Sequence, residues 1–124
     1  MNTIIATNLF VLILAAHFIG DWLLQPSWMA LQKSSNWKVR FIHCLVYTAC
    51  FFWLGIDWCA FIFTTHFIID SYIPLYWFRR LRDGMTMDEF KESFKTPVGF
   101  VVNVAMDQIF HFLLFVPIIL TYKK

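Results

Sequence analysis

Four long apolar segments, separated by polar ones, run along the chain. They cover roughly residues 3–24, 41–58, 59–78 and 98–122. About 20 mainly apolar residues are enough for a helix to cross a bilayer, and one uninterrupted helix over the middle two segments would overshoot a hydrocarbon core of about 30 Å. Gly55 and Asp57 mark the break between those two segments. The pattern predicts an all-α, polytopic membrane protein, a single transmembrane domain over residues 1–124 folded as a four-transmembrane-helix bundle.

The basic residues predict how this bundle is oriented. The chain has ten Lys and Arg in total, and all except Lys123 and Lys124 lie in two longer connections, residues 27–40 and 79–95. Loops rich in Lys and Arg stay on the cytoplasmic side of a membrane. We therefore expect both long connections in the cytoplasm and both termini outside.

Local signals predict two helix starts near the end of the second connection. Thr86 and Glu89 have the spacing of a capping box, and Thr96 and Pro97 have the character of an N-cap and a first helical residue. We expect a short cytoplasmic interfacial helix from Thr86, lying on the membrane surface, and the last span just beyond Thr96.

Composition supports the membrane assignment and excludes other classes. Hydrophobic residues make up 60% of the chain and charged residues 15%, whereas soluble domains average about 45–50% and about 25%. The net charge is only +2, so there is no basic field for a nucleic acid to bind. A soluble domain, a disordered chain and a nucleic-acid binder are excluded, and the expected partner is the lipid bilayer.

Seven titratable groups lie inside the predicted spans, where each is costly. An Asp at the centre of a membrane helix costs about 2.5–3.5 kcal/mol on insertion scales. Six of the seven form pairs four residues apart, which places both members on one helix face. Antiparallel spans bring all seven into the cytoplasmic half and the midplane of the membrane. The candidate metal ligands are His17 with Asp21, His66 with Asp70, Asp107 with His111, and the unpaired His43.

Three interpretations of this set compete. The first is a metal site, because imidazole nitrogen and carboxylate oxygen suit a divalent transition metal, with zinc the first choice; seven groups could serve one ion with supporting carboxylates, or two ions sharing an Asp. The second is translocation, in which His/Asp pairs relay protons or divalent ions. The third is purely structural, but interhelical hydrogen bonds of about 0.6 kcal/mol each poorly offset the insertion cost.

Four motifs occur in order along the four spans and carry a family resemblance. They are Ala16–Gln25 (AHFIGDWLLQ), His43-Cys44-Leu45, His66–Asp70 (HFIID) and Asp107–His111 (DQIFH). Together with Lys33, they resemble the small bacterial and phage membrane proteins grouped as domain of unknown function 3307. The resemblance covers nearly the whole chain and implies a multi-pass fold in the bacterial inner membrane and an important His/Asp set. It implies no particular activity.

The favoured hypothesis is a membrane-embedded, metal-dependent hydrolase. A bound ion would lower the pKa of water toward about 7, and a carboxylate that does not bind the ion would act as base. The candidate catalytic residues are Asp21, Asp70 and Asp107. Gln25 and Gln108, beside the ligands, are expected to support them by hydrogen bonding.

The expected substrate is a lipid or a lipid-linked molecule that enters from the cytoplasmic leaflet. Arg79 and Arg80 could then hold an anionic headgroup. One alternative is a proton or divalent-ion transporter or channel, built as a homo-oligomer because four thin helices enclose little volume. A second is a membrane interaction factor of a phage or bacterium without catalysis.

Overall fold

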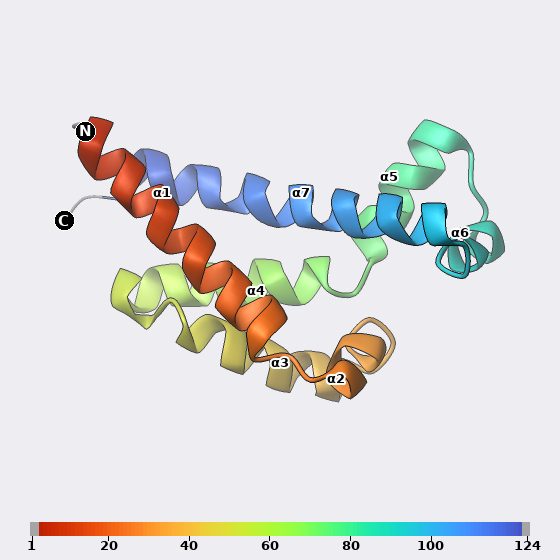
Figure 1. The fold of residues 1–124 in the computed structure, drawn as a ribbon, viewed down its shortest axis with the longest axis horizontal. Helices are drawn as coiled ribbons and strands as arrows, with labels where there is room; N and C mark the ends of the chain where they lie inside the picture. The colour runs from red at the N-terminus through yellow and green to blue at the C-terminus, as the bar shows by residue number, and fades with distance from the viewer. Residues whose placement is uncertain (1–2, 123–124) are drawn as a thin grey trace.

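The computed structural model describes residues 3–122, and over these residues the chain forms helices joined by short turns (Figure 1). Four helical stretches form the bundle. They are α1 (Thr3–Phe18) with its continuation η1 (Ile19–Leu23), α3 (Trp37–Ala49), α4 (Ile56–Ile69) and α7 (Pro97–Thr121). Of these, α4 and α7 follow the long direction of the molecule and the first helix crosses obliquely (Figure 1). This confirms the predicted all-α class.

Three shorter helices gather at the end of the bundle that lies away from the start of α1 and the end of α7 (Figure 1). They are α2 (Ser27–Gln32), α5 (Ile73–Asp83) and α6 (Met87–Ser93). The predicted capping box at Thr86 is confirmed, with both of its hydrogen bonds present, and α6 begins after it. The predicted start of the last helix is confirmed as well, since the Thr96 side chain accepts from the Gly99 N–H.

Two helices are long and apolar enough to cross a membrane. They are the 21 residues Thr3–Leu23 and the 25 residues Pro97–Thr121, and the bent pair α4 and α5 would make a third if it crosses as one span. α3 has 13 residues, which at 1.5 Å per residue gives about 20 Å and falls short of a bilayer core of about 30 Å. Two or three of the four predicted spans are therefore supported.

The predicted span 59–78 is not one helix. The chain bends by 53° between α4 and α5. Tyr72 adopts a left-handed backbone conformation, with φ of 59°, and Pro74 lies in the first turn of α5. Proline lacks an N–H and clashes with the preceding turn, so α4 cannot continue through it. This bend places Asp70 at the carboxyl end of α4.

The break predicted between residues 54 and 58 is present. Gly55 has φ of 98°, a conformation that favours glycine, and the short 3₁₀ turn η2 (Phe52–Leu54) precedes it. The turn joins α3 and α4 as an antiparallel pair.

An apolar core fills the half of the bundle toward the start of α1 and the end of α7. Its buried members come from α1, α3, α4, α7 and the turn after α3: Leu9, Ile13, Ala16, Tyr47, Phe51, Leu54, Ile62, Phe115 and Ile118. Many large apolar side chains also face outward, such as Leu12 and Leu113. This apolar exterior is typical of helices in contact with lipid.

Gly20 allows η1, the continuation of α1, to approach α3 closely. A Cβ atom built on Gly20 would lie 2.8 Å from Cδ2 of Tyr47, whose ring is fully enclosed. We expect Gly20→Ala to lower the free energy of unfolding by about 1–3 kcal/mol, the usual cost of overpacking, measured by thermal unfolding in detergent. Ala15→Val, which adds bulk at an exposed position of the same helix, is the control and should change little.

Candidate metal centre

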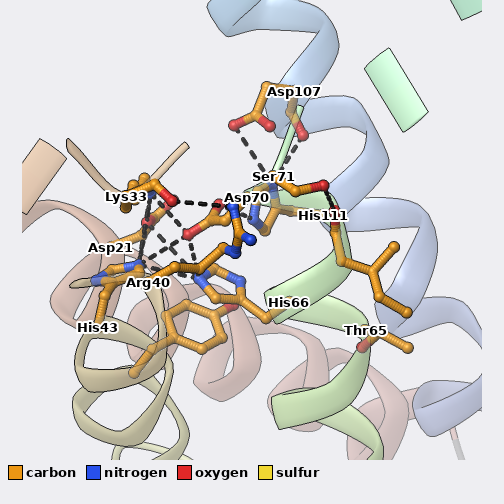
Figure 2. A network of polar contacts seen from close by, with 12 residues as sticks. Asp21, Lys33, Arg40, His43, Thr65, His66, Asp70, Ser71, Asp107 and His111 are labelled. Carbon is orange, nitrogen blue, oxygen red and sulfur yellow. Dashed lines mark hydrogen bonds and ion pairs between the residues drawn. The ribbon is translucent and has the colours of Figure 1, made fainter. Parts of the chain in front are cut away.

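The predicted titratable groups do gather in one place. Asp21 comes from the π-helical turn η1, His43 from α3, His66 and Asp70 from α4, and Asp107 and His111 from α7 (Figure 2). Each is at most 5% exposed. They lie where the apolar core ends and the short helices begin. The π-turn that carries Asp21 is a distortion often found at functional sites.

A first group of four ligand atoms converges from three segments. The Nε2 atoms of His43 and His66 are 3.0 Å apart. His43 Nε2 lies 3.1 Å from Asp21 Oδ1 and 3.2 Å from Asp70 Oδ2, and His66 Nε2 lies 3.1 Å and 4.0 Å from Asp70 Oδ2 and Asp21 Oδ1. For ion-to-ligand distances of about 2.0–2.2 Å, the ligand atoms of a tetrahedral zinc site lie about 3.3–3.6 Å apart. Four of the observed spacings are slightly shorter than this, and the spacing between His66 Nε2 and Asp21 Oδ1 is longer.

Hydrogen bonding among the four residues cannot account for the convergence. A neutral imidazole carries a hydrogen on only one of its nitrogens, yet Nε2 of His43 faces two carboxylate oxygens and a second imidazole nitrogen at once. In addition, Nδ1 of His43 and Nδ1 of His66 are buried and have no hydrogen-bond partner among the described residues. A positive charge would satisfy the converging atoms together, and the Lys33 ammonium group supplies one, with its Nζ 2.9 Å from Asp21 Oδ1, 3.0 Å from Asp70 Oδ2 and 3.4 Å from His43 Nε2.

A second group shares Asp70 with the first. Asp70, Asp107 and His111 also offer ligand atoms that lie within 4.8 Å of one another. His111 Nε2 is 3.4 Å from Asp70 Oδ1, and its Nδ1 is 3.6 Å from Asp107 Oδ2 and 2.8 Å from the Asp107 carbonyl oxygen. The buried Asp and His residues could therefore hold one ion or two, with Asp70 between them.

Lys33 contacts three members of the first group, although the sequence placed it only among the loop charges and in the family resemblance, without a role at the site. Its Nζ is 2.9 Å from Asp21 Oδ1 and 3.0 Å from Asp70 Oδ2. Lys33 follows α2, and Arg40 holds this turn by donating to the carbonyl oxygens of Lys33 and Ser34. The signal available in the sequence was the place of Lys33 beside the four motifs that carry the family resemblance.

The buried carboxylates keep Lys33 charged. Burial opposes the charge on Lys33, but the carboxylates of Asp70 and Asp21 outweigh it and raise the pKa of the ammonium group above its ordinary value. Lys33 is therefore charged at neutral pH. Two buried carboxylates, those of Asp21 and Asp70, contact this ammonium group, and a third, that of Asp107, is buried beside His111. Buried charge is costly unless it is paired, and Lys33 and the imidazoles are the groups that pair these carboxylates.

His17 is buried beside the cluster, outside both groups of converging atoms. Its Nδ1 is 2.8 Å from the Tyr47 hydroxyl and its Nε2 is 2.9 Å from Oε1 of Gln108. The Gln108 amide in turn donates to Asp21 Oδ2 at 3.5 Å and to Asp107 Oδ2 at 3.3 Å. Gln108 thus links His17 to two carboxylates, and the ligand role of His17 stays a prediction. Tyr47, which the sequence did not single out, also stacks on the His66 ring at 3.6 Å.

The remaining predicted site residues have different surroundings. Gln25 is half-buried, and its Oε1 has no hydrogen-bond partner among residues 3–122. Arg79 is buried: its Nε is 2.7 Å from Asp83 Oδ2 and its Nη1 donates to Asn103. Arg80 is exposed and donates to the Tyr76 hydroxyl. Only Arg80 is free to meet a headgroup, so the predicted role of Arg79 has no geometric support.

The fold and the site together describe an all-helical protein with helices of membrane-spanning length and a buried cluster of histidine and aspartate that could hold a metal ion. The chain belongs to the family described as protein of unknown function (DUF3307), which matches residues 9–124. This confirms the resemblance found in the sequence motifs. Neither the curated proteins nor the solved structures contain a match to the chain.

Proposed function

We propose that the chain holds a divalent transition metal, zinc in the first instance, through Asp21, His43, His66 and Asp70. The observation that carries this proposal is the convergence of four buried ligand atoms at spacings near those of a tetrahedral site. Lys33 does not prevent binding, because a carboxylate oxygen has two lone pairs and can contact an ion and an ammonium group together.

We further propose that the site works as a membrane-embedded hydrolase on a lipid or lipid-linked substrate. A divalent ion supplies a Lewis acid and activates water. Asp107 lies outside the first group, and its Oδ1 is buried without a hydrogen-bond partner among the described residues, which suits a general base. Lys33 supplies a fixed positive charge next to the reacting groups, and Arg80 is placed to meet an anionic headgroup.

The shape of the bundle favours a hydrolase over a proton or ion translocator. Beyond His17 and His111, the interior of the bundle is filled by the apolar core described above. A translocation path needs polar or wet positions along its length. Within the described chain the buried polar groups stop at mid-bundle. If vesicles containing the protein nevertheless carried an ion flux that Asp70→Asn abolished, the translocation interpretation would replace the hydrolase.

Elemental analysis of the purified full chain tests the metal proposal. We expect about one transition metal ion per chain, or two if both groups are filled, and loss of the metal on dialysis against a chelator. His66→Ala should lower the content because His66 is placed among the converging atoms. Protein that contains no stoichiometric transition metal, and takes up none on incubation with zinc, would contradict the proposal.

A further inference from the structure

An apolar groove of about 560 Å³ lies next to the cluster, among the short helices. Its volume is within the range of about 300–1,000 Å³ typical of ligand sites. Aromatic side chains from α5, α6 and α7 line it: Tyr72, Tyr76, Phe90, Phe94 and Phe100. The Tyr72 and Phe94 rings stack at 5.2 Å, and the Tyr76 hydroxyl is already engaged by Arg80.

Two polar residues of the groove are chain neighbours of cluster residues. Ser34 and Ser71 line the groove, and they directly follow Lys33 and Asp70 in the chain. Tyr72 lines the groove at the α4–α5 bend in its left-handed conformation. Such a conformation costs a non-glycine residue about 1–3 kcal/mol and is found preferentially at functional sites. The bend therefore holds Asp70 toward the cluster and Tyr72 toward the groove.

The rim of the groove is apolar and exposed. Leu31, Ile73, Met87 and Phe100 line it and are all exposed large hydrophobic residues. Trp28 of α2 and Trp77 of α5 are also exposed, at 51% and 52%, on the same short helices. Tryptophan is enriched where a membrane meets water. The exposed tryptophans on these helices suit the level where a lipid headgroup meets its acyl chains.

We propose that this groove binds one acyl chain of a membrane lipid, with the polar head of the lipid at the serine end beside Lys33 and Asp70. The proposal deepens the proposed function and rests on it for the reaction, because the head would then lie next to the metal ligands. An apolar chain suits an aromatic floor that offers few free hydrogen-bonding groups, whereas a peptide would leave its backbone groups unpaired. Lys91 at the rim adds a positive charge that suits an anionic lipid.

Photo-crosslinking in vesicles tests the groove. The full chain is placed in phosphatidylethanolamine vesicles containing a small fraction of phosphatidylglycerol with a diazirine in one acyl chain. After illumination, peptides are mapped by mass spectrometry. We expect the label to be enriched several-fold on the peptides with Tyr76, Phe90 and Phe94 relative to the exposed apolar faces of α1 and α7.

A blocking variant and a matched control sharpen the test. Ala30 lines the groove and is exposed, so Ala30→Trp fills the groove without disturbing the core. Ala15→Trp makes the same change at an exposed position on α1. We expect groove labelling to fall several-fold in Ala30→Trp and to stay unchanged in Ala15→Trp.

Three outcomes would overturn the acyl-chain proposal. They are an even spread of label over all lipid-facing helices, labelling insensitive to Ala30→Trp, and a crosslink between two copies of the chain at the groove. Repeating the experiment after chelation separates this proposal from the metal site. Groove labelling that persists after chelation would show that the acyl chain binds without the metal, so a failure of the metal proposal in the elemental analysis would leave the groove proposal standing. Bound metal without groove labelling would remove only the acyl chain.

Discussion

Replacing Asp70 with asparagine should abolish metal binding at both ligand groups. Oδ2 of Asp70 faces His43 and His66, and Oδ1 faces His111, so a single carboxylate serves both positions. An amide removes the negative charge and presents N–H donors in place of one oxygen. Loss of a residue that hydrogen-bonds to a metal ligand typically lowers the metal affinity by about 10–100-fold. Loss of the shared ligand itself should therefore lower the zinc affinity by about 100-fold or more. Zinc titration against a competing chelator in detergent measures the change.

Two further variants make the Asp70 result interpretable. Asp57→Asn makes the same chemical change at an exposed position at the start of α4 and should bind zinc like the parent protein. His111→Ala removes a ligand of the second group only and should leave one ion bound. If Asp70→Asn keeps its helix content by circular dichroism and still binds zinc at the parent affinity, the placement of the metal at these residues is wrong.

Replacing Lys33 with methionine should cause the largest loss of stability. The ammonium group separates two buried carboxylates at 2.9 and 3.0 Å, and methionine fills similar space without the charge. Removing one partner of a buried ion pair costs about 3–5 kcal/mol, because the other charge is left uncompensated. Thermal unfolding of the metal-free protein in detergent measures this loss.

The raised pKa of Lys33 determines how the stability loss in Lys33→Met depends on pH. A group with a raised pKa contributes its full stabilisation below its unfolded-state pKa, about 10.4 for lysine, and loses it only as the pH rises through the higher folded value. The difference between parent and Lys33→Met should thus stay constant from about pH 7 to about pH 9. Added zinc should stabilise the variant more than the parent, since it restores the missing positive charge.

The exposed Lys38 supplies the control for charge removal. Lys38→Met, in the first turn of α3, should change the unfolding temperature little, as most surface substitutions do. Equal stability of Lys33→Met and the parent protein would show that the ammonium group does not hold the carboxylates in place.

The parts of the site that could be predicted from sequence are those set by helical periodicity. Asp70 with His66 and Asp107 with His111 are each four residues apart, and each pair shares a helix face in the structure as it must. Placing an aspartate in an apolar segment costs free energy, and this cost is what marked these residues as a group. The convergence of separate helices followed from their alternating direction.

The parts that could not be predicted depend on contacts between distant segments. Lys33 looks like an ordinary loop charge until α2 folds back and brings it to Asp21 and Asp70. The α4–α5 bend depends on Pro74, whose effect is hidden in a continuous apolar run. His17 has the same spacing from Asp21 as the other pairs, yet Tyr47 and Gln108, on two other helices, take both of its nitrogens.

The apolar half of the bundle has a consequence for turnover. Ile13, Phe51, Phe115 and their neighbours fill the interior on one side of the cluster. Substrate would therefore have to enter, and product leave, through the same opening among α2, α5 and α6. A slowly departing product would then block the next molecule from entering, and the rate would be set by release into one leaflet.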